Sequence, residues 1–167
     1  DNIDYLFYLD ADEFIDIPER TALIEKLITT KISNSVTKLT WKNYIPENTE
    51  LKTVRLHTNL LPTPNKSIHS KVIISKQVKS HNKDLRISTG NHTLHGIEGN
   101  QIPAVNIGTI NHIPIRSKSQ AIRKALVTAI ALLAKPNRPK GSHYQYLEFL
   151  NHIASGEISD DTLRQFT

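Results

Sequence analysis

The sequence contains no cysteine and no methionine, and only one of its 167 residues is tryptophan. The absence of cysteine excludes a disulfide framework and a zinc site built from thiolates. No apolar run reaches the roughly 20 residues that a membrane-spanning helix needs. Because methionine is absent and the chain starts with Asp-Asn-Ile-Asp, we expect a piece of a longer protein, and the lack of a targeting segment then carries no meaning.

Long runs of one charge are also absent, although the chain has a net charge of +5. Its 21 Lys and Arg residues are dispersed and show no basic–aromatic repeat, which argues against nucleic acid as the main partner. A positive balance fits a solvated basic surface, an anionic ligand such as a nucleotide diphosphate, or an anionic membrane face. With 38% hydrophobic residues, the composition is that of an ordinary globular domain.

The hydrophobic pattern predicts an α/β protein whose strands come first and whose paired helices come last. Short apolar or β-branched runs are typical of strands, and they occur at residues 5–9, 36–41, 69–74 and 105–113. Pro18 fits the first turn of a helix, and the apolar residues behind it recur at helical spacing: Leu23, Ile24, Leu27 and Ile28. The remaining segments indicate a turn, a loop and an irregular stretch, at residues 43–46, 47–67 and 78–91 respectively.

Two C-terminal helices have clear start signals. Ser117 and Ser142 are each followed three residues later by glutamine, which is the spacing of a capping box. Pro136 is expected to end the first of these helices, and Gly156 follows the second, where a glycine commonly closes a helix. We expect one last short turn from Ser159 onward.

Asp10 and Asp12 follow the apolar run at residues 5–9, which we expect to be a strand buried on both faces. Two carboxylates one residue apart at a strand end are able to turn toward one hard cation, and Mn²⁺ or Mg²⁺ prefers such oxygen ligands. Acidic residues at strand ends are common, however. The pattern alone therefore leaves a metal site and an exposed turn as alternatives.

Five segments resemble, in order, motifs of the family-2-like glycosyltransferases with the GT-A fold, and they span nearly all of the chain. Residues 7–18 resemble the DxDEF segment of that group. The later segments resemble its SK-hydrophobic strand, its G-x-H segment, its H-Y-P-x-R-S segment and its G-x-H-aromatic element, at residues 69–74, 90–95, 112–117 and 142–144. The sequence departs from the pattern at Ile113, where an aromatic residue is usual.

The resemblance implies an α/β, GT-A-like fold whose mixed sheet carries the DxD strand, with two C-terminal helices packed beside it. It implies a single domain over residues 1–167, with the sheet region in residues 1–116 and the helices in residues 117–167. The Rossmann-like half that holds the nucleotide base and ribose in this fold would be absent. We therefore expect the chain by itself to bind a donor weakly.

The resemblance also implies transfer of a sugar from a nucleotide donor, UDP-sugar first, to a saccharide or lipid-linked acceptor in surface-glycan synthesis. Asp10, Asp12 and His112 would hold Mn²⁺ or Mg²⁺, which stabilises the leaving nucleoside diphosphate. A strand-end histidine bonded to backbone is the alternative for His112. Such an enzyme is expected in the cytoplasm, with peripheral association at the inner membrane face, and without a nucleic acid partner.

Other residues receive roles from the same resemblance. Lys71 and Arg116 would neutralise diphosphate charge, although a solvated surface position explains each as well. Trp41 would stack on an acceptor sugar, and three histidines are expected near the cleft: His69, His92 and His95. A core tryptophan and ordinary surface histidines are the alternatives. The general base stays unassigned, because Glu13 and Glu98 are both carboxylates without a deciding feature.

Two other functions stay open. A haloacid-dehalogenase-type phosphatase also ends a strand in Asp-x-Asp and uses the first Asp as its nucleophile, but it wants Thr or Val where this chain has Phe14. A non-catalytic or truncated module that binds carbohydrate or another subunit is the third hypothesis. Metal binding by the chain would separate this module from the glycosyltransferase.

Overall fold

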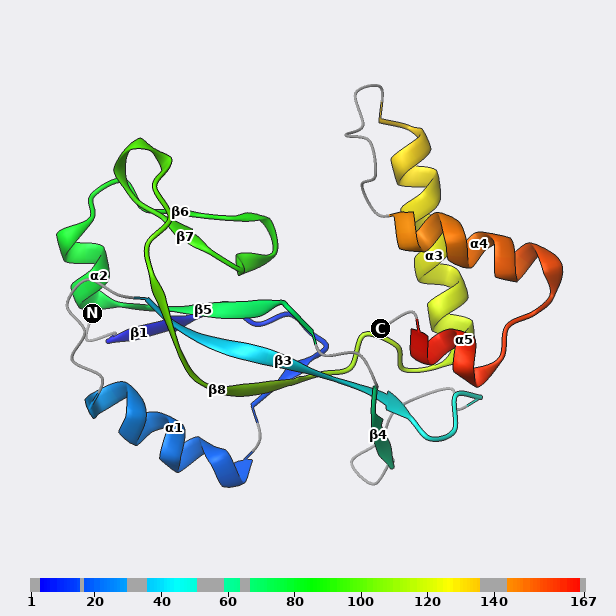
Figure 1. The fold of residues 1–167 in the computed structure, drawn as a ribbon, viewed down its shortest axis with the longest axis horizontal. Helices are drawn as coiled ribbons and strands as arrows, with labels where there is room; N and C mark the ends of the chain where they lie inside the picture. Colours follow the sequence, from blue (N-terminus) through cyan, green and yellow to red (C-terminus); the bar gives the residue numbers. More distant parts are fainter. Residues whose placement is uncertain are drawn as a thin grey trace. The chain divides into compact units, whose positions relative to one another are not determined.

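The computed structural model describes residues 4–15, 17–29, 36–50, 59–63, 67–135 and 144–165. These residues have a mixed α/β fold, with one six-stranded mixed sheet and a second sheet of two strands (Figure 1). The chain groups into two compact units: Asp1–Lys42 with Lys66–His112, and Asn43–Asn65 with Ile113–Thr167. No helix in the described part of the chain is long and apolar enough to cross a membrane.

The first unit is built on five strands in the spatial order β1-β5-β3-β8-β2. β5 pairs antiparallel with both β1 and β3, and β2 pairs antiparallel with β8. The β-branched runs predicted the longer strands correctly, because such side chains pack well on a pleated surface. The bounds are Tyr5–Phe7 (β1), Glu13–Phe14 (β2), Val36–Pro46 (β3), Ser70–Ser75 (β5) and Ala104–His112 (β8).

Both faces of β5 are buried, and its side chains alternate between two hydrophobic clusters. Ile73 belongs to the cluster on which helix α1 (Ile17–Thr29) packs. Ile74 belongs to the opposite cluster, which also holds residues of helix α2 and of the β6–β7 pair. Figure 1 shows α1 on one side of the sheet and α2, β6 and β7 on the other. The bounds of these elements are Lys76–His81 (α2), Arg86–Ile87 (β6) and Leu94–His95 (β7).

The second unit pairs the end of β3 with β4 and packs its helices around a small apolar core. Ala121 and Ala125 on helix α3 belong to that core together with the buried ring of Phe149 on α4. Their small side chains let the two helices come close. The bounds are Leu60–Pro62 (β4), Lys118–Leu133 (α3), Tyr144–Ser155 (α4) and Asp160–Gln165 (α5).

The predicted cap of α3 is confirmed. Ser117 Oγ accepts a hydrogen bond from Gln120 N at 3.2 Å. The Gln120 side chain reaches back to accept one from Arg116 N at 3.2 Å, one residue earlier than in a standard capping box. The predicted turn after Ser159 is the start of α5, where Ser159 Oγ accepts from Thr162 N. Ser142, the second predicted cap, lies outside the described residues.

Four predictions about local structure are wrong. The segment at residues 47–67, predicted as a loop, contains strand β4. The run at residues 5–9 is not buried on both faces: Leu6 is 43% and Leu9 is 40% exposed, because β1 is an end strand of the sheet order. Residues 43–46 do not form a turn, since pairing with β4 extends β3 through them. Residues 78–91 are not irregular throughout, because they include the end of α2 and all of β6.

Candidate functional site

The candidate site continues the α1-facing core at one end of the first unit's sheet. Leu39, Ile73 and Ile110 belong to one buried cluster and come from three neighbouring strands. Residues two apart on a strand share a face. The next residue on that face is aromatic or polar in each strand: Trp41 beside Leu39, Lys71 beside Ile73, and His112 beside Ile110. The face therefore changes from apolar to polar along its length.

The acidic segment at residues 10–13 forms a closed turn. Glu13 N donates to Asp10 O at 3.1 Å, and Asp10 N donates to a Glu13 carboxylate oxygen at 2.9 Å. Its far end is held by the sheet, because Glu13 is the register partner of His112 between β2 and β8. That register brings Asp12 beside His112, with Asp12 Oδ2 3.7 Å from His112 Nε2.

Lys71 is fully buried and lies against this turn. Its ammonium is 2.6 Å from Asp10 Oδ2 and 3.2 Å from Glu13 Oε1. The Glu13 side chain is itself 0% exposed, whereas that of Asp10 is 58% exposed. Burying a charge is tolerated only when it is paired, so the three groups form one electrostatic unit. This role of Glu13 was not predicted from the sequence, although a lysine within an otherwise apolar strand indicates a buried acidic partner.

Trp41 is the centre of a cluster of rings. His112 stacks on it with ring centroids 4.0 Å apart and planes inclined by 21°. His69 and His92 lie at 5.2 and 5.3 Å from Trp41, and 4.9 Å from each other. Lys71 Nζ is 5.7 Å from the centroid of the Trp41 ring, within the range of a cation–π contact. The structure thus brings together Trp41 and three of the histidines that the sequence had singled out, but not His95.

Two further features define this cluster. The buried indole Nε1 of Trp41 has no hydrogen-bond partner among the described residues. His92 Nδ1 donates to Ser70 O at 2.7 Å, which fixes the orientation of its ring. Gly90 lies against that ring with φ +80°, and a Cβ there would come 2.5 Å from His92 Nε2. Glycine is therefore required at position 90 for both its backbone conformation and the space it leaves.

Among the described residues, no group of three or more His, Asp or Glu side chains is arranged to hold one metal ion. The Asp12–His112 pair nevertheless fits a shared cation. Two ligand atoms at about 2.1 Å from one ion lie roughly 3.0–3.5 Å apart, close to the 3.7 Å between Asp12 Oδ2 and His112 Nε2. Asp10 differs, because Lys71 already neutralises its carboxylate. Phosphate oxygens and water commonly supply the other positions around such ions.

The other candidate residues have separate environments. Arg116 belongs to the second unit and is exposed, with its backbone N bonded to Gln120. Glu98 is exposed in a short 3₁₀ turn (Ile97–Gly99) at φ 63°. His95 contacts its own loop, with Nδ1 3.0 Å from Gly99 O. None of these observations assigns a general base.

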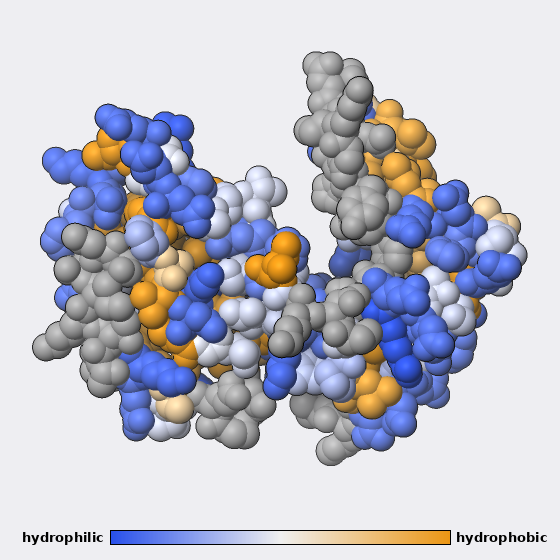
Figure 2. All heavy atoms as spheres, in the orientation of Figure 1, coloured by the Kyte–Doolittle hydropathy of each residue, from blue (hydrophilic) through white to orange (hydrophobic). Residues whose placement is uncertain are grey.

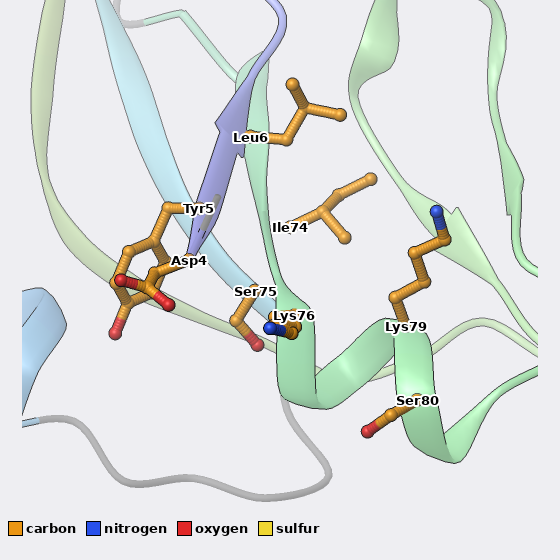
Figure 3. Close-up of a pocket in the computed structure, with 8 residues that line it drawn as sticks. All are labelled: Asp4, Tyr5, Leu6, Ile74, Ser75, Lys76, Lys79 and Ser80. Carbon is orange, nitrogen blue, oxygen red and sulfur yellow. The ribbon is translucent and has the colours of Figure 1, made fainter. Parts of the chain in front are cut away.

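A separate hollow of about 550 Å³ lies along β1 and the start of α2 (Figure 3). Leu6 and Ile74 line its apolar part, and Lys76 and Lys79 lie on α2 beside it. None of its lining residues belongs to the acidic turn or to the cluster of rings. It is therefore not part of the candidate site.

The pKa of His69 should lie below the ordinary value for histidine. Partial burial against neighbouring rings lowers the pKa of His69 below 6.5, and the charge of His92 lowers it further. His69 then contributes stability above pH 6.5 that is lost as the pH falls through its folded-state pKa. An NMR titration should place the His69 pKa below 6.5, and His92→Gln should raise it. A value at or above 6.5 would contradict this environment.

Comparisons with protein-family models, with curated proteins and with solved structures find no match to this chain. Its function is therefore argued from the geometry of this site and from the order of the sequence motifs.

Proposed function

We propose that the protein is a metal-dependent glycosyltransferase that uses a nucleotide-sugar donor, with UDP as the preferred nucleotide. The observation that carries the proposal is the Asp12–His112 pair at 3.7 Å. The pair offers one oxygen and one nitrogen atom as metal ligands just after β1. The order of the sequence motifs predicts that the donor diphosphate binds there. The GT-A arrangement of the sheet is part of the same proposal.

In this proposal Asp12 and His112 hold Mn²⁺ or Mg²⁺, and imidazole favours Mn²⁺. The cation, when bound, stabilises the negative charge that develops on the departing nucleoside diphosphate. Trp41 fixes the orientation of His112 by stacking on its ring. Lys71 and Glu13 keep the turn closed, so that Asp12 stays within reach of His112. Lys71 is thus assigned to positioning, in place of the direct diphosphate contact expected from the sequence.

The acceptor is proposed to be a saccharide or a lipid-linked saccharide. Because His112 covers one face of Trp41, sugar stacking on that face is excluded in this arrangement. The phosphatase alternative, in which Asp10 would be the nucleophile, rests on the Asp-x-Asp pattern of the sequence alone.

The diphosphate–metal part of the reaction depends on residues within this chain, so binding of UDP with Mn²⁺ is the deciding test. Calorimetric titration should detect UDP binding in the presence of Mn²⁺ and none in the presence of EDTA. Asp161→Asn, which removes an exposed carboxylate of the second unit, is the control and should bind as the wild type does. UDP release from a panel of UDP-sugars then identifies the donor. Because the chain by itself is expected to bind a donor weakly, the proposal is lost if neither Mn²⁺ alone nor UDP with Mn²⁺ binds.

A further inference from the structure

Helix α3 has two apolar faces, and the part of the chain that the structure describes covers only one of them. Ala121, Ala125, Ala129 and Leu132 are buried. On the remaining surface, four aliphatic side chains are 42–76% exposed: Leu126, Val127, Ile130 and Leu133. Positions 126, 130 and 133 follow helical spacing, so they form one stripe along the C-terminal half of the helix. Figure 2 shows apolar side chains at the surface along α3.

The chain around this stripe carries charge of one sign. No Asp or Glu occurs between residues 99 and 147, whereas seven of the chain's 21 Lys and Arg residues do. Arg123 is exposed one turn before the stripe, and Lys135 is exposed directly after the helix. Lys118 lies at the start of the helix and pairs with Glu50, with Nζ 3.7 Å from Oε1, so Arg123 and Lys135 are the cations that remain beside the stripe. An exposed aliphatic stripe with cations at both ends is the pattern of a helix that lies in a membrane interface.

We infer that α3 binds the surface of a bilayer that contains anionic phospholipid. The aliphatic stripe enters the boundary between headgroups and acyl chains. The cations at its ends contact lipid phosphates, while the aliphatic parts of their side chains lie against the acyl chains. With 16 residues the helix is shorter than the roughly 20 that span a bilayer, so it lies along the surface. This inference does not depend on the proposed glycosyltransferase activity.

A second copy of the chain is a poorer occupant of this surface. An isologous contact through α3 would bring Arg123 and Lys135 of both copies together, and α3 contains no acidic residue to offset them. An apolar protein surface with acidic residues at its rim is the other occupant with matching chemistry. The experiment below distinguishes both from lipid.

Co-sedimentation of the whole chain with vesicles tests the inference. Vesicles of phosphatidylcholine with phosphatidylglycerol should bind the protein, and pure phosphatidylcholine vesicles should bind it much less. Val127→Asp with Ile130→Asp should lower the partition coefficient by about tenfold or more, because it places charge on the exposed aliphatic surface of α3. Arg123→Gln with Lys135→Gln should lower it by about fivefold for each cation removed. All four positions and the control position below are exposed, so folding should be retained.

The matched control is Ile97→Asp, which removes an aliphatic side chain of the first unit that is 59% exposed. It should leave vesicle binding unchanged, and circular dichroism should show that every variant is folded. Absence of binding to anionic vesicles overturns the inference. So does binding that Val127→Asp with Ile130→Asp does not weaken. A dimer in light scattering that these substitutions dissociate, without vesicle binding, would assign the stripe to a second copy.

Discussion

Replacing Lys71 with methionine should lower the free energy of unfolding by about 3–5 kcal/mol, the usual cost of removing one partner from a buried ion pair. Methionine nearly preserves the volume of the lysine stem, so the loss is electrostatic rather than a cavity effect. The Glu13 carboxylate, whose side chain is 0% exposed, would be left buried without the ammonium that lies 3.2 Å away. Urea denaturation followed by Trp41 fluorescence measures the change, since Trp41 belongs to the same unit.

Two controls make this prediction specific. Lys79→Met removes an exposed lysine from α2 of the same unit, and it should change stability by no more than about 0.5 kcal/mol. Lys71→Met combined with Glu13→Gln should recover part of the loss, because the buried charge that Lys71 neutralised is then absent. A loss for Lys71→Met similar to that for Lys79→Met would show that the buried ion pair does not form.

Asp12→Asn should weaken Mn²⁺ binding by more than about tenfold, the lower bound for losing even an outer-shell partner of a metal. Asn keeps the shape of the side chain but removes the charge beside His112. Asp10→Asn should weaken binding much less, because Lys71 already neutralises that carboxylate. Its main effect should be lower stability, since Lys71 then loses one of its two acidic partners. Electron paramagnetic resonance of free Mn²⁺ gives the affinities, and thermal unfolding gives the stabilities.

Comparison of Asp10→Asn with Asp12→Asn shows whether one or both carboxylates bind the metal ion. Equal loss of Mn²⁺ affinity in Asp10→Asn and Asp12→Asn would show that both carboxylates bind the ion, and that Lys71 releases Asp10 when it does. Unchanged affinity in both variants would remove the metal from the proposal. His112→Gln is the independent check and should weaken Mn²⁺ binding while leaving the ion pairs of Lys71 in place.

Sequence analysis was most successful where structure depends on neighbours along the chain. The run Val72-Ile-Ile74 lies in a strand because β-branched side chains favour one, and Ser117 caps α3 through an atom three residues away. It failed at residues 43–46, where local turn signals were overridden by pairing with β4. It also failed at Leu6 and Leu9, because apolar composition does not reveal that a strand is at the end of a sheet.

For the candidate site too, the sequence determined some features and the tertiary structure decided others. The amino-acid sequence by itself determined which groups are chemically notable: Asp10, Asp12, Trp41, Lys71 and His112. Only the tertiary structure decided how they pair, because Lys71 and Asp10 are 61 positions apart and meet through strand register. The same holds for the stacking of His112 on Trp41 and for the exposed stripe of α3. A hydrophobic period shows that a helix has an apolar face, but only packing decides which face is covered.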